Sequence, residues 1–254
     1  RQPRQMTPFP ENNLNIAPSG YPAVSGPVSR LEPRYFGSVG YYAEVAACGG
    51  NAVMDGTMLF DKRRKQVHRC DIADVNGVVQ LTVPVGKPHG IPRATWSDVR
   101  VSSHGRWWHV HRVTLESAYG RTPFFEFYID RFAPFLCAEA VERYPFIIDL
   151  DAAIDAVIRE ILLLPPAPVL NAVAKEEGVS EGASASVAKQ TAAFPNLSSG
   201  MIEKPHYQVR AAGLGYIPGL SVLDLIFNLG PEAPLYLAEM ASRCVRSQTE
   251  CGAR

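Results

Sequence analysis

Residues 107–128 read WWHVHRVTLESAYGRTPFFEFY. Aromatic rings, two histidines, two carboxylates and two arginines crowd into this one stretch. Such a mixture is poor material for a plain hydrophobic core, because each buried polar group needs a partner. It suits the lining of a pocket, where apolar walls carry a few polar groups. The stretch therefore predicts a ligand site.

The spacing of apolar residues predicts a helix from residue 106 to residue 119. His111, Leu115 and Tyr119 recur every four residues, so they share one face of that helix. His109 then points well away from His111, because two residues on a helix diverge by about 200°. A shared metal site for the two histidines is therefore not expected.

Other segments carry the periodicity or the end signals of regular elements. Further helices are predicted at residues 41–47, 124–131, 149–164, 221–229 and 232–243, the fourth of them with Ser221 as its N-cap. Strands are predicted at residues 51–59, 67–72, 78–85 and 207–210. Asn76-Gly77 lies between two apolar runs, which is a strong signal for a hairpin. Together these patterns predict an α/β fold, a single mixed-sheet domain with packed helices.

Composition divides the chain into three parts. Residues 1–33 carry seven prolines and are expected to form a disordered N-terminal arm. Residues 34–245 are expected to form the domain. Within it, residues 171–204 are rich in Ala, Ser, Gly and Glu, which is typical of a flexible insertion ahead of the C-terminal helices.

Overall charge and cysteine content narrow the function classes. The formal net charge is +0, whereas general nucleic-acid binders are usually basic, so no nucleic-acid partner is expected. The five cysteines are scattered without a CxxC pair, so neither a disulfide scaffold nor a cysteine zinc site is expected, and a cytoplasmic location is the simplest. No apolar run approaches the roughly 20 residues of a membrane span.

Three residues are candidates for acid–base chemistry. His111 is a candidate general base, and the alternative is a structural histidine. Glu116 is a second candidate, although Arg112 stands four residues before it and an ion pair along the helix explains it equally well. Asp55 precedes Gly56 at the expected end of a strand, where functional carboxylates are common in α/β sheets.

Cations and aromatic rings are candidates for holding a substrate. The basic run at 62–65 and Arg69 could bind a phosphate or a carboxylate, and the alternative for the run is a solvated loop. Tyr119, Phe124 and Tyr128 could stack on a sugar or belong to the core. With His89, these residues make up the predicted binding set. We expect Arg69, His89, His111, Glu116 and Tyr119 to converge on one cleft.

Four segments, in chain order, resemble the WbqC-like family. They are YFGSVGYY at 35–42; HRCDI at 68–72 with NG at 76–77, LTVPV at 81–85 and KPHG at 87–90; Trp107 and His111 with ESAY at 116–119 and PFFEFY at 123–128; and IPGLSVLDLIFN at 217–228 followed by GPE at 230–232. The chain departs from the family pattern at Gly40, Arg112 and Leu229, where Gln, Trp and an acidic residue are usual.

The resemblance implies a role beside bacterial O-antigen and surface-polysaccharide genes. A cytoplasmic aminoacyl or acyl transferase acting on a nucleotide-linked sugar, with glycine as one candidate group, is the leading hypothesis. A non-catalytic binding protein for a nucleotide sugar or glycan precursor is the first alternative, and a metal-dependent hydrolase is the second. The expected partner is a small molecule or nucleotide sugar. The sequence names no cofactor and no oligomeric state.

Overall fold

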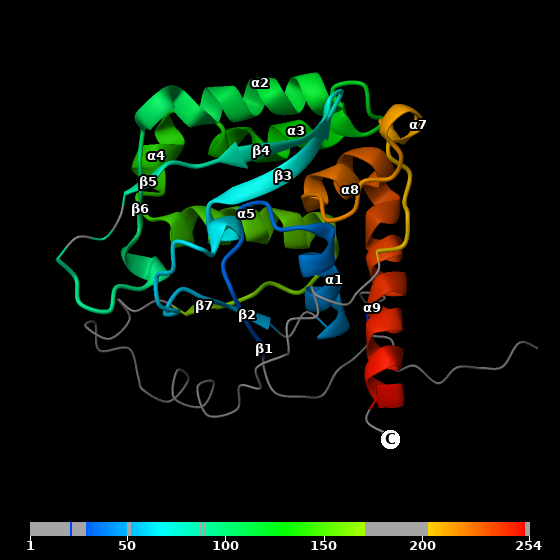
Figure 1. The fold of residues 1–254 in the computed structure, drawn as a ribbon, viewed down its shortest axis with the longest axis horizontal. Coiled ribbons are helices and arrows are strands. Elements are labelled where there is room, and N and C mark those ends of the chain that lie inside the picture. The colour runs from blue at the N-terminus through cyan, green and yellow to red at the C-terminus, as the bar shows by residue number, and fades with distance from the viewer. Residues whose placement is uncertain are drawn as a thin grey trace, which may run out of the picture.

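The strands form three small sheets within the part of the chain that the computed structural model describes, namely residues 21, 29–49, 52–86, 88, 90–170 and 203–251. Helices pack around these sheets, which confirms the α/β class (Figure 1). In chain order the elements are β1 (Ser29–Leu31), α1 (Val39–Ala47), β2 (Ala52–Asp55), η1 (Lys65–Val67), β3 (Arg69–Asp74), β4 (Gly77–Thr82), β5 (Val85–Gly86), η2 (Trp96–Asp98), β6 (Arg100–Val101), η3 (His104–Arg106), α2 (Trp107–Tyr119), α3 (Phe125–Phe132), η4 (Ala133–Phe135), α4 (Glu139–Arg143), α5 (Ile147–Ile161), β7 (Val169–Leu170), α7 (Ala211–Leu214), α8 (Val222–Leu229), η7 (Gly230–Glu232) and α9 (Ala233–Cys251).

A parallel sheet has the strand order β1-β2-β7, and α1 connects its first two strands. The predicted disordered arm is therefore wrong at its end, because residues 29–31 pair with β2. Ser29 and Leu31 are buried there, and the burial and the strand hydrogen bonds offset the entropy of ordering. Residues 1–20 and 22–28 of the arm, and residues 171–202 of the predicted insertion, lie outside the described residues.

The predicted hairpin is confirmed as β3 and β4, which pair antiparallel around Asn76-Gly77. Gly77 has a positive φ of 118°, a conformation that glycine adopts without strain. β4 ends at Thr82 rather than at Val85, because Pro84 has no N–H for a strand ladder. Along β3, Cys70 and Ile72 face inward, while Arg69 and Asp71 face outward.

α2 confirms the helix predicted at residues 106–119, and it lies against the hairpin (Figure 1). His111, Leu115 and Tyr119 are all buried, as their shared face requires. Tyr119 accepts a hydrogen bond from the backbone N–H of Ala73, and His111 contacts the carbonyl of Thr82. The two side chains therefore tie α2 to both strands of the hairpin.

α8 is the most deeply buried helix segment, and its prediction is also confirmed. Every residue from Val222 to Asn228 is buried, and the side chain of Ser221 caps the N-terminus by accepting from Leu223 N–H. Gly230 follows with a positive φ of 52°, and a side chain there would collide with the ring of Phe124. α8 contacts α1, α3, α9 and β3, so it joins the helical layer to the hairpin.

The strand predicted at residues 207–210 is wrong. The backbone N–H of Val209 donates to the side chain of Asn228. The side-chain amide of Gln208 donates to the carbonyl of Ile217 and accepts from its N–H. A side chain of α8 therefore takes the N–H of Val209, and the carbonyls of Gln208 and Arg210 accept from Ala211 and Gly213 of α7, so these groups are not left for a strand ladder.

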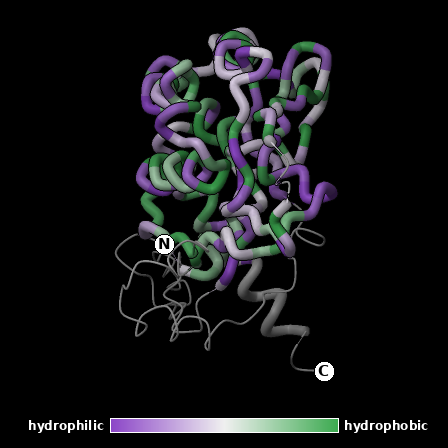
Figure 2. The backbone as a smooth tube through the Cα atoms, turned by 90° about the vertical axis from the view of Figure 1, so that its left-hand side faces the viewer, coloured by the Kyte–Doolittle hydropathy of each residue, from purple (hydrophilic) through white to green (hydrophobic). Residues whose placement is uncertain are grey.

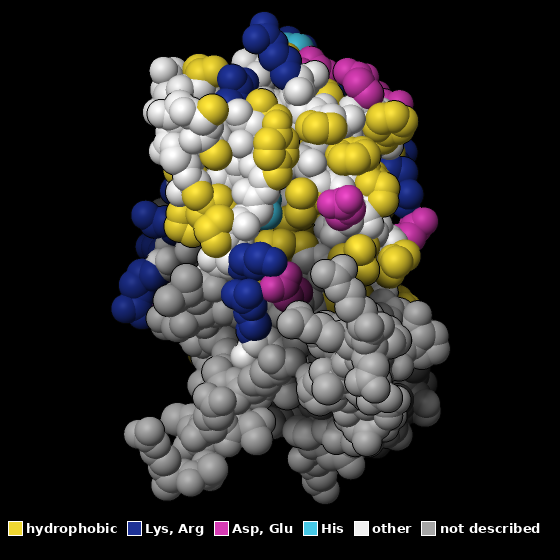
Figure 3. All heavy atoms as spheres, turned by 90° about the vertical axis from the view of Figure 1, so that its right-hand side faces the viewer, with side chains coloured by type: hydrophobic (Ala, Val, Ile, Leu, Met, Phe, Trp, Pro, Cys, Tyr) yellow, Lys and Arg dark blue, Asp and Glu magenta, His cyan; other side chains and the backbone are white. Residues whose placement is uncertain are grey.

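Hydrophobic stretches of the backbone run through the middle of the molecule, and hydrophilic ones lie mostly toward its edge (Figure 2). On the side of α7 and α9, apolar side chains are interspersed with basic and acidic ones (Figure 3). Among the described residues, no helix is both long and apolar enough to span a membrane.

Candidate functional site

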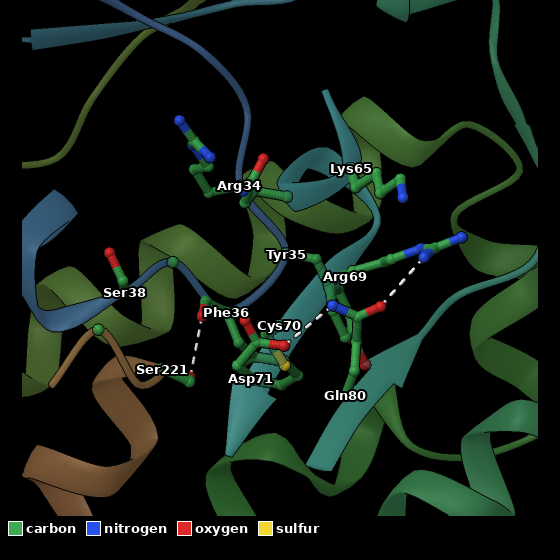
Figure 4. Close-up of a pocket in the computed structure, with 13 residues that line it drawn as sticks. Arg34, Tyr35, Phe36, Ser38, Lys65, Arg69, Cys70, Asp71, Gln80 and Ser221 are labelled. Atoms are coloured by element: carbon green, nitrogen blue, oxygen red, sulfur yellow. Dashed lines mark hydrogen bonds between the residues drawn. The ribbon is translucent and has the colours of Figure 1, made fainter. Parts of the chain in front are cut away.

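A small pocket lies where five segments meet: the loop before α1, η1, β3, β4 at Gln80 and the turn before α8 (Figure 4). Its volume of about 120 Å³ is room for several water molecules or one small polar group. We call it the cationic pocket. Its lining residues are Arg34, Tyr35, Phe36, Gly37, Ser38, Lys65, Gln66, Arg69, Cys70, Asp71, Gln80, Gly219 and Ser221.

The loop ahead of α1 forms one wall because its sequence permits a tight turn. Phe36 adopts a positive φ of 42°, and Gly37 lies so close to the ring of Tyr41 that an added Cβ would stand 2.7 Å from it. The serines that cap α1 and α8, Ser38 and Ser221, both line the pocket. The positive ends of two helices therefore meet at this pocket.

Three cations line the pocket against one carboxylate. Arg34 pairs with Glu32 at 3.0 Å, and Arg69 donates to Gln80 at 3.0 Å. The Nε atoms of both arginines are buried and have no hydrogen-bond partner among the described residues. Lys65 adds a third positive charge, and Asp71 is the carboxylate. Figure 4 shows Arg34 on one side of the pocket and Lys65 and Arg69 on the other. This arrangement suits an anionic group.

The residues of the basic run at 62–65 differ in which of the two predictions they fit, a solvated loop or a binding site for an anion. Arg63 pairs with Asp61 and is exposed, and Arg64 pairs with Glu32. These two fit a solvated basic loop. Lys65 lines the cationic pocket, so it fits the ligand-binding interpretation.

His111 is buried, and both of its ring nitrogens are engaged, one of them by Tyr35 of the pocket lining. Nε2 lies 3.1 Å from the carbonyl oxygen of Thr82, and Nδ1 lies 2.9 Å from the hydroxyl of Tyr35. A carbonyl can only accept, so Nε2 carries the proton and Nδ1 accepts from the Tyr35 hydroxyl. Burial lowers the pKa of His111 to about 4, against a smaller opposing effect of the bond to Thr82. This histidine is neutral at pH 7 and offers no unengaged nitrogen to a substrate.

A titration would test the structural role of His111. We expect its ring resonances to stay at their neutral positions from pH 7 down to pH 5 and to move near pH 4, because burial disfavours the charged ring. Proton NMR of the imidazole, assigned with His111→Gln, measures this. A midpoint near the ordinary value of about 6.5 would show instead a ring open to solvent and fit to act as a base.

The other two predicted acid–base residues also have structural partners away from the pocket lining. Glu116 pairs with Arg112 at 3.0 Å on the exposed face of α2, which is the ion pair that the spacing allowed. Asp55 is buried at the end of β2, where it pairs with Arg30 at 2.5 Å and accepts from Thr57 N–H and Oγ1.

The predicted aromatic residues lie in or against the core. Tyr119 is buried, Phe124 packs over Gly230, and Tyr128 is half-buried against core residues. His89 lies outside the described residues. Of the predicted site residues that the structure does describe, only Arg69 appears in the lining of the cationic pocket. α2 contacts the hairpin through His111 and Tyr119, whereas Arg69 belongs to the outward face of β3, so the expected convergence is not found.

α5 carries a set of buried charges that was not predicted from the sequence. Asp151, Asp155 and Arg159 recur every four residues and are all buried, so they share one face of the helix. The signal in the sequence for this buried set was the presence of charged residues within the apolar stripe of the helix. Asp151 is 0% exposed, and its carboxylate oxygens have no hydrogen-bond partner among the described residues. Burial, and then the neighbouring Asp155, raise the pKa of Asp151 well above its usual range, while Arg34 opposes them.

A second polar network, also missed, connects to the edge of the pocket. Asp224 of α8 bonds to His206 Nε2 at 2.8 Å, and His206 Nδ1 lies 3.2 Å from the hydroxyl of Tyr216. Tyr216 donates to Glu203, which also accepts from the N–H of Gly219, a lining residue. This network was not predictable from the sequence, because residues 203–216 carry no motif. Parts of this segment were instead predicted as the end of an insertion, up to residue 204, and as a strand at residues 207–210.

Comparison with known proteins identifies the family. The model of the WbqC-like protein family matches residues 32–193, well over half of the chain, so the chain belongs to this family. The match includes Arg34, Lys65 and Arg69 but ends before the turn at Gly219 and Ser221. No curated protein and no solved structure matches the chain.

Proposed function

We propose that this chain binds a phosphorylated small molecule, a nucleotide-linked sugar, in the cationic pocket and transfers an aminoacyl or acyl group to it. The observation that carries the proposal is the lining of three cations against one carboxylate, with two buried guanidinium N–H groups that have no partner in the part of the chain that the structure describes. Guanidinium groups hold phosphate through charge-assisted hydrogen bonds. The family implies the setting, which is cytoplasmic synthesis of O-antigen or another surface polysaccharide.

In the proposed transfer an amine or hydroxyl of the sugar attacks the carbonyl of the donor. The new C–N or C–O bond forms, the carrier leaves with its bonding electrons, and a base takes the proton of the nucleophile. The roles that the sequence suggests for His111, Glu116 and Asp55 remain predictions. Each of the three already has a structural partner.

A binding protein without catalysis is the second candidate, and the engagement of both His111 nitrogens favours it. Mass spectrometry of nucleotide sugars incubated with the protein and acyl or aminoacyl donors distinguishes the two. Turnover that His111→Ala abolishes, with binding intact, supports the transferase and a base at His111. The metal-dependent hydrolase has no supporting observation, because no group of three His, Cys, Asp or Glu side chains suited to a metal occurs among the described residues.

Calorimetric titration with inorganic pyrophosphate tests the pocket. Arg69→Met is expected to weaken binding by roughly 10- to 100-fold, because a hydrogen bond to a charged group contributes about 1.5–3 kcal/mol. The matched control is Arg112→Met, which removes an exposed arginine whose partner is Glu116 on α2. The control should bind as the unmodified protein does. No binding of pyrophosphate, or equal losses in both variants, would show that this pocket is not the anion site.

A further inference from the structure

A second cavity of about 340 Å³ lies beside the cationic pocket, and Arg69 lines both. Its walls come from the ends of the β3–β4 hairpin, from Phe60 and from η2. We call it the apolar cavity. Arg69 belongs to both linings, so a ligand that extends past this side chain would contact both spaces.

The walls of the apolar cavity are largely apolar and aromatic. Val83, Val85 and Phe60 line it together with Trp96. Phe60 and Trp96 pack edge to face, with ring centroids 4.9 Å apart and an interplanar angle of 69°. This arrangement gives the cavity two aromatic walls close to perpendicular, which suits a flat ring better than a charged group.

Two side chains of the lining, Trp96 and His68, carry polar groups with a hydrogen bond left to make. Trp96 is 1% exposed, and its indole N–H is buried without an acceptor among the described residues. His68 donates from Nδ1 to the carbonyl of Val83 at 3.1 Å, so its Nε2 carries a lone pair when the ring is neutral. Burial lowers the pKa of His68, which favours the neutral ring.

The positive charges of the lining are Lys62 and Arg69. Arg69 keeps a buried Nε–H that has no partner among the described residues, and it also lines the space between Lys65 and Arg34. A ligand whose flat ring fills the apolar cavity would therefore present its anionic groups to the cations of the neighbouring pocket.

We propose that the apolar cavity binds the nucleobase of a nucleotide whose phosphates occupy the cationic pocket, with Arg69 between the two. The proposal rests on the function proposed above and adds the recognition of the base. An acyl chain would fill the same walls, but it would leave the Trp96 N–H and the His68 lone pair without partners. A base carries ring carbonyls or ring nitrogens to accept from the indole and N–H groups to donate to the imidazole.

Calorimetry with matched diphosphates tests this assignment. The probes are inorganic pyrophosphate, the nucleoside diphosphates UDP, dTDP, CDP, GDP and ADP, and geranyl diphosphate, which carries an apolar chain without hydrogen-bonding groups. At least one nucleoside diphosphate should bind 10-fold or more tightly than pyrophosphate. Trp96→Phe keeps an aromatic ring but removes the N–H, and it should erase most of that advantage while pyrophosphate binds unchanged.

Two further variants keep the result interpretable. Trp108→Phe is the matched control, because Trp108 lies on α2 and is absent from the lining of either cavity. His68→Ala is a second test that removes the acceptor if Trp96→Phe does not fold. It should also reduce the advantage of the nucleotide over pyrophosphate.

Each other outcome overturns the assignment. Nucleoside diphosphates that bind no better than pyrophosphate remove the base site but leave the proposed anion pocket intact. If a nucleoside diphosphate binds more tightly than pyrophosphate but neither Trp96→Phe nor His68→Ala reduces this advantage, the base binds outside the apolar cavity. A preference for geranyl diphosphate assigns the cavity to an apolar chain. If no diphosphate binds at all, this inference and the proposed function both fail.

Discussion

Replacing Asp155 by Ala is expected to lower the free energy of unfolding by about 3–5 kcal/mol, the range for breaking a buried ion pair from one side. Asp155 pairs with Arg159 at 2.6 Å, and both side chains are almost wholly buried. Asp155 also accepts from the hydroxyl of Tyr42 at 2.8 Å. Removing the carboxylate would take the Asp155 side of this ion pair away from the buried guanidinium and remove the acceptor of the tyrosine hydroxyl. Denaturant unfolding at fixed pH measures the loss.

The exposed pair of Arg131 and Glu160 supplies the control for this experiment. It has the same 2.6 Å separation, but its side chains are 42% and 69% exposed. Glu160→Ala should therefore cost about 0–1 kcal/mol, as exposed ion pairs generally do. The double variant Asp155→Ala, Arg159→Leu should recover part of the loss, because no charge is then left buried. Equal losses in the free energy of unfolding for Asp155→Ala and Glu160→Ala would show that burial does not determine how much an ion pair contributes to stability.

The elements that local patterns specify were predictable from the sequence. α2, α5 and α8 each carry an apolar face at helical spacing, and Ser221 supplies a cap signal at the start of α8. Asn76-Gly77 specifies the hairpin, because its turn needs a residue with positive φ. In each case the information lies within one segment, so no tertiary contact is needed to find the element.

The lining of the pocket depends on contacts that no local pattern reports. Arg34, Lys65 and Arg69 come from three segments, and only the folded chain brings them to one place. The spacing of α2 predicted that His111 faces inward, but it could not show that Thr82 and Tyr35 would engage both nitrogens. The strand expected at residues 207–210 failed for a related reason, because the side chain of Asn228, distant in sequence, takes the backbone N–H of Val209.

Replacing Asp151 by Asn is expected to make the free energy of unfolding less sensitive to a rise in pH above about 4. The carboxyl of Asp151 is fully buried without a hydrogen-bond partner among the described residues, and burial holds its pKa well above the usual range. An acid whose pKa is raised by folding binds its proton more tightly in the folded state. The contribution of Asp151 to stability is therefore greatest at low pH, and it falls once the pH passes the pKa of about 4 that the carboxyl has in the unfolded state.

The size of the effect follows from proton linkage. Between the unfolded and the folded pKa of Asp151, the unmodified protein should lose up to about 1.4 kcal/mol per pH unit relative to Asp151→Asn. His111 acts in the opposite direction, because its lowered pKa makes stability rise with pH between about 4 and 6.5. Its contribution is common to both proteins, so the difference between their unfolding free energies isolates Asp151.

Denaturant unfolding of the two proteins at intervals from pH 4.5 to pH 8 measures this difference, with Asp130→Asn as the control for an exposed carboxyl on α3. A difference that does not change with pH would mean that Asp151 reaches water or finds a partner in solution. The result also bears on the cationic pocket, because Arg34 is the cation that opposes the raised pKa of Asp151. While Asp151 stays protonated, it does not compete with Glu32, or with an anion bound in the pocket, for the positive charge of Arg34.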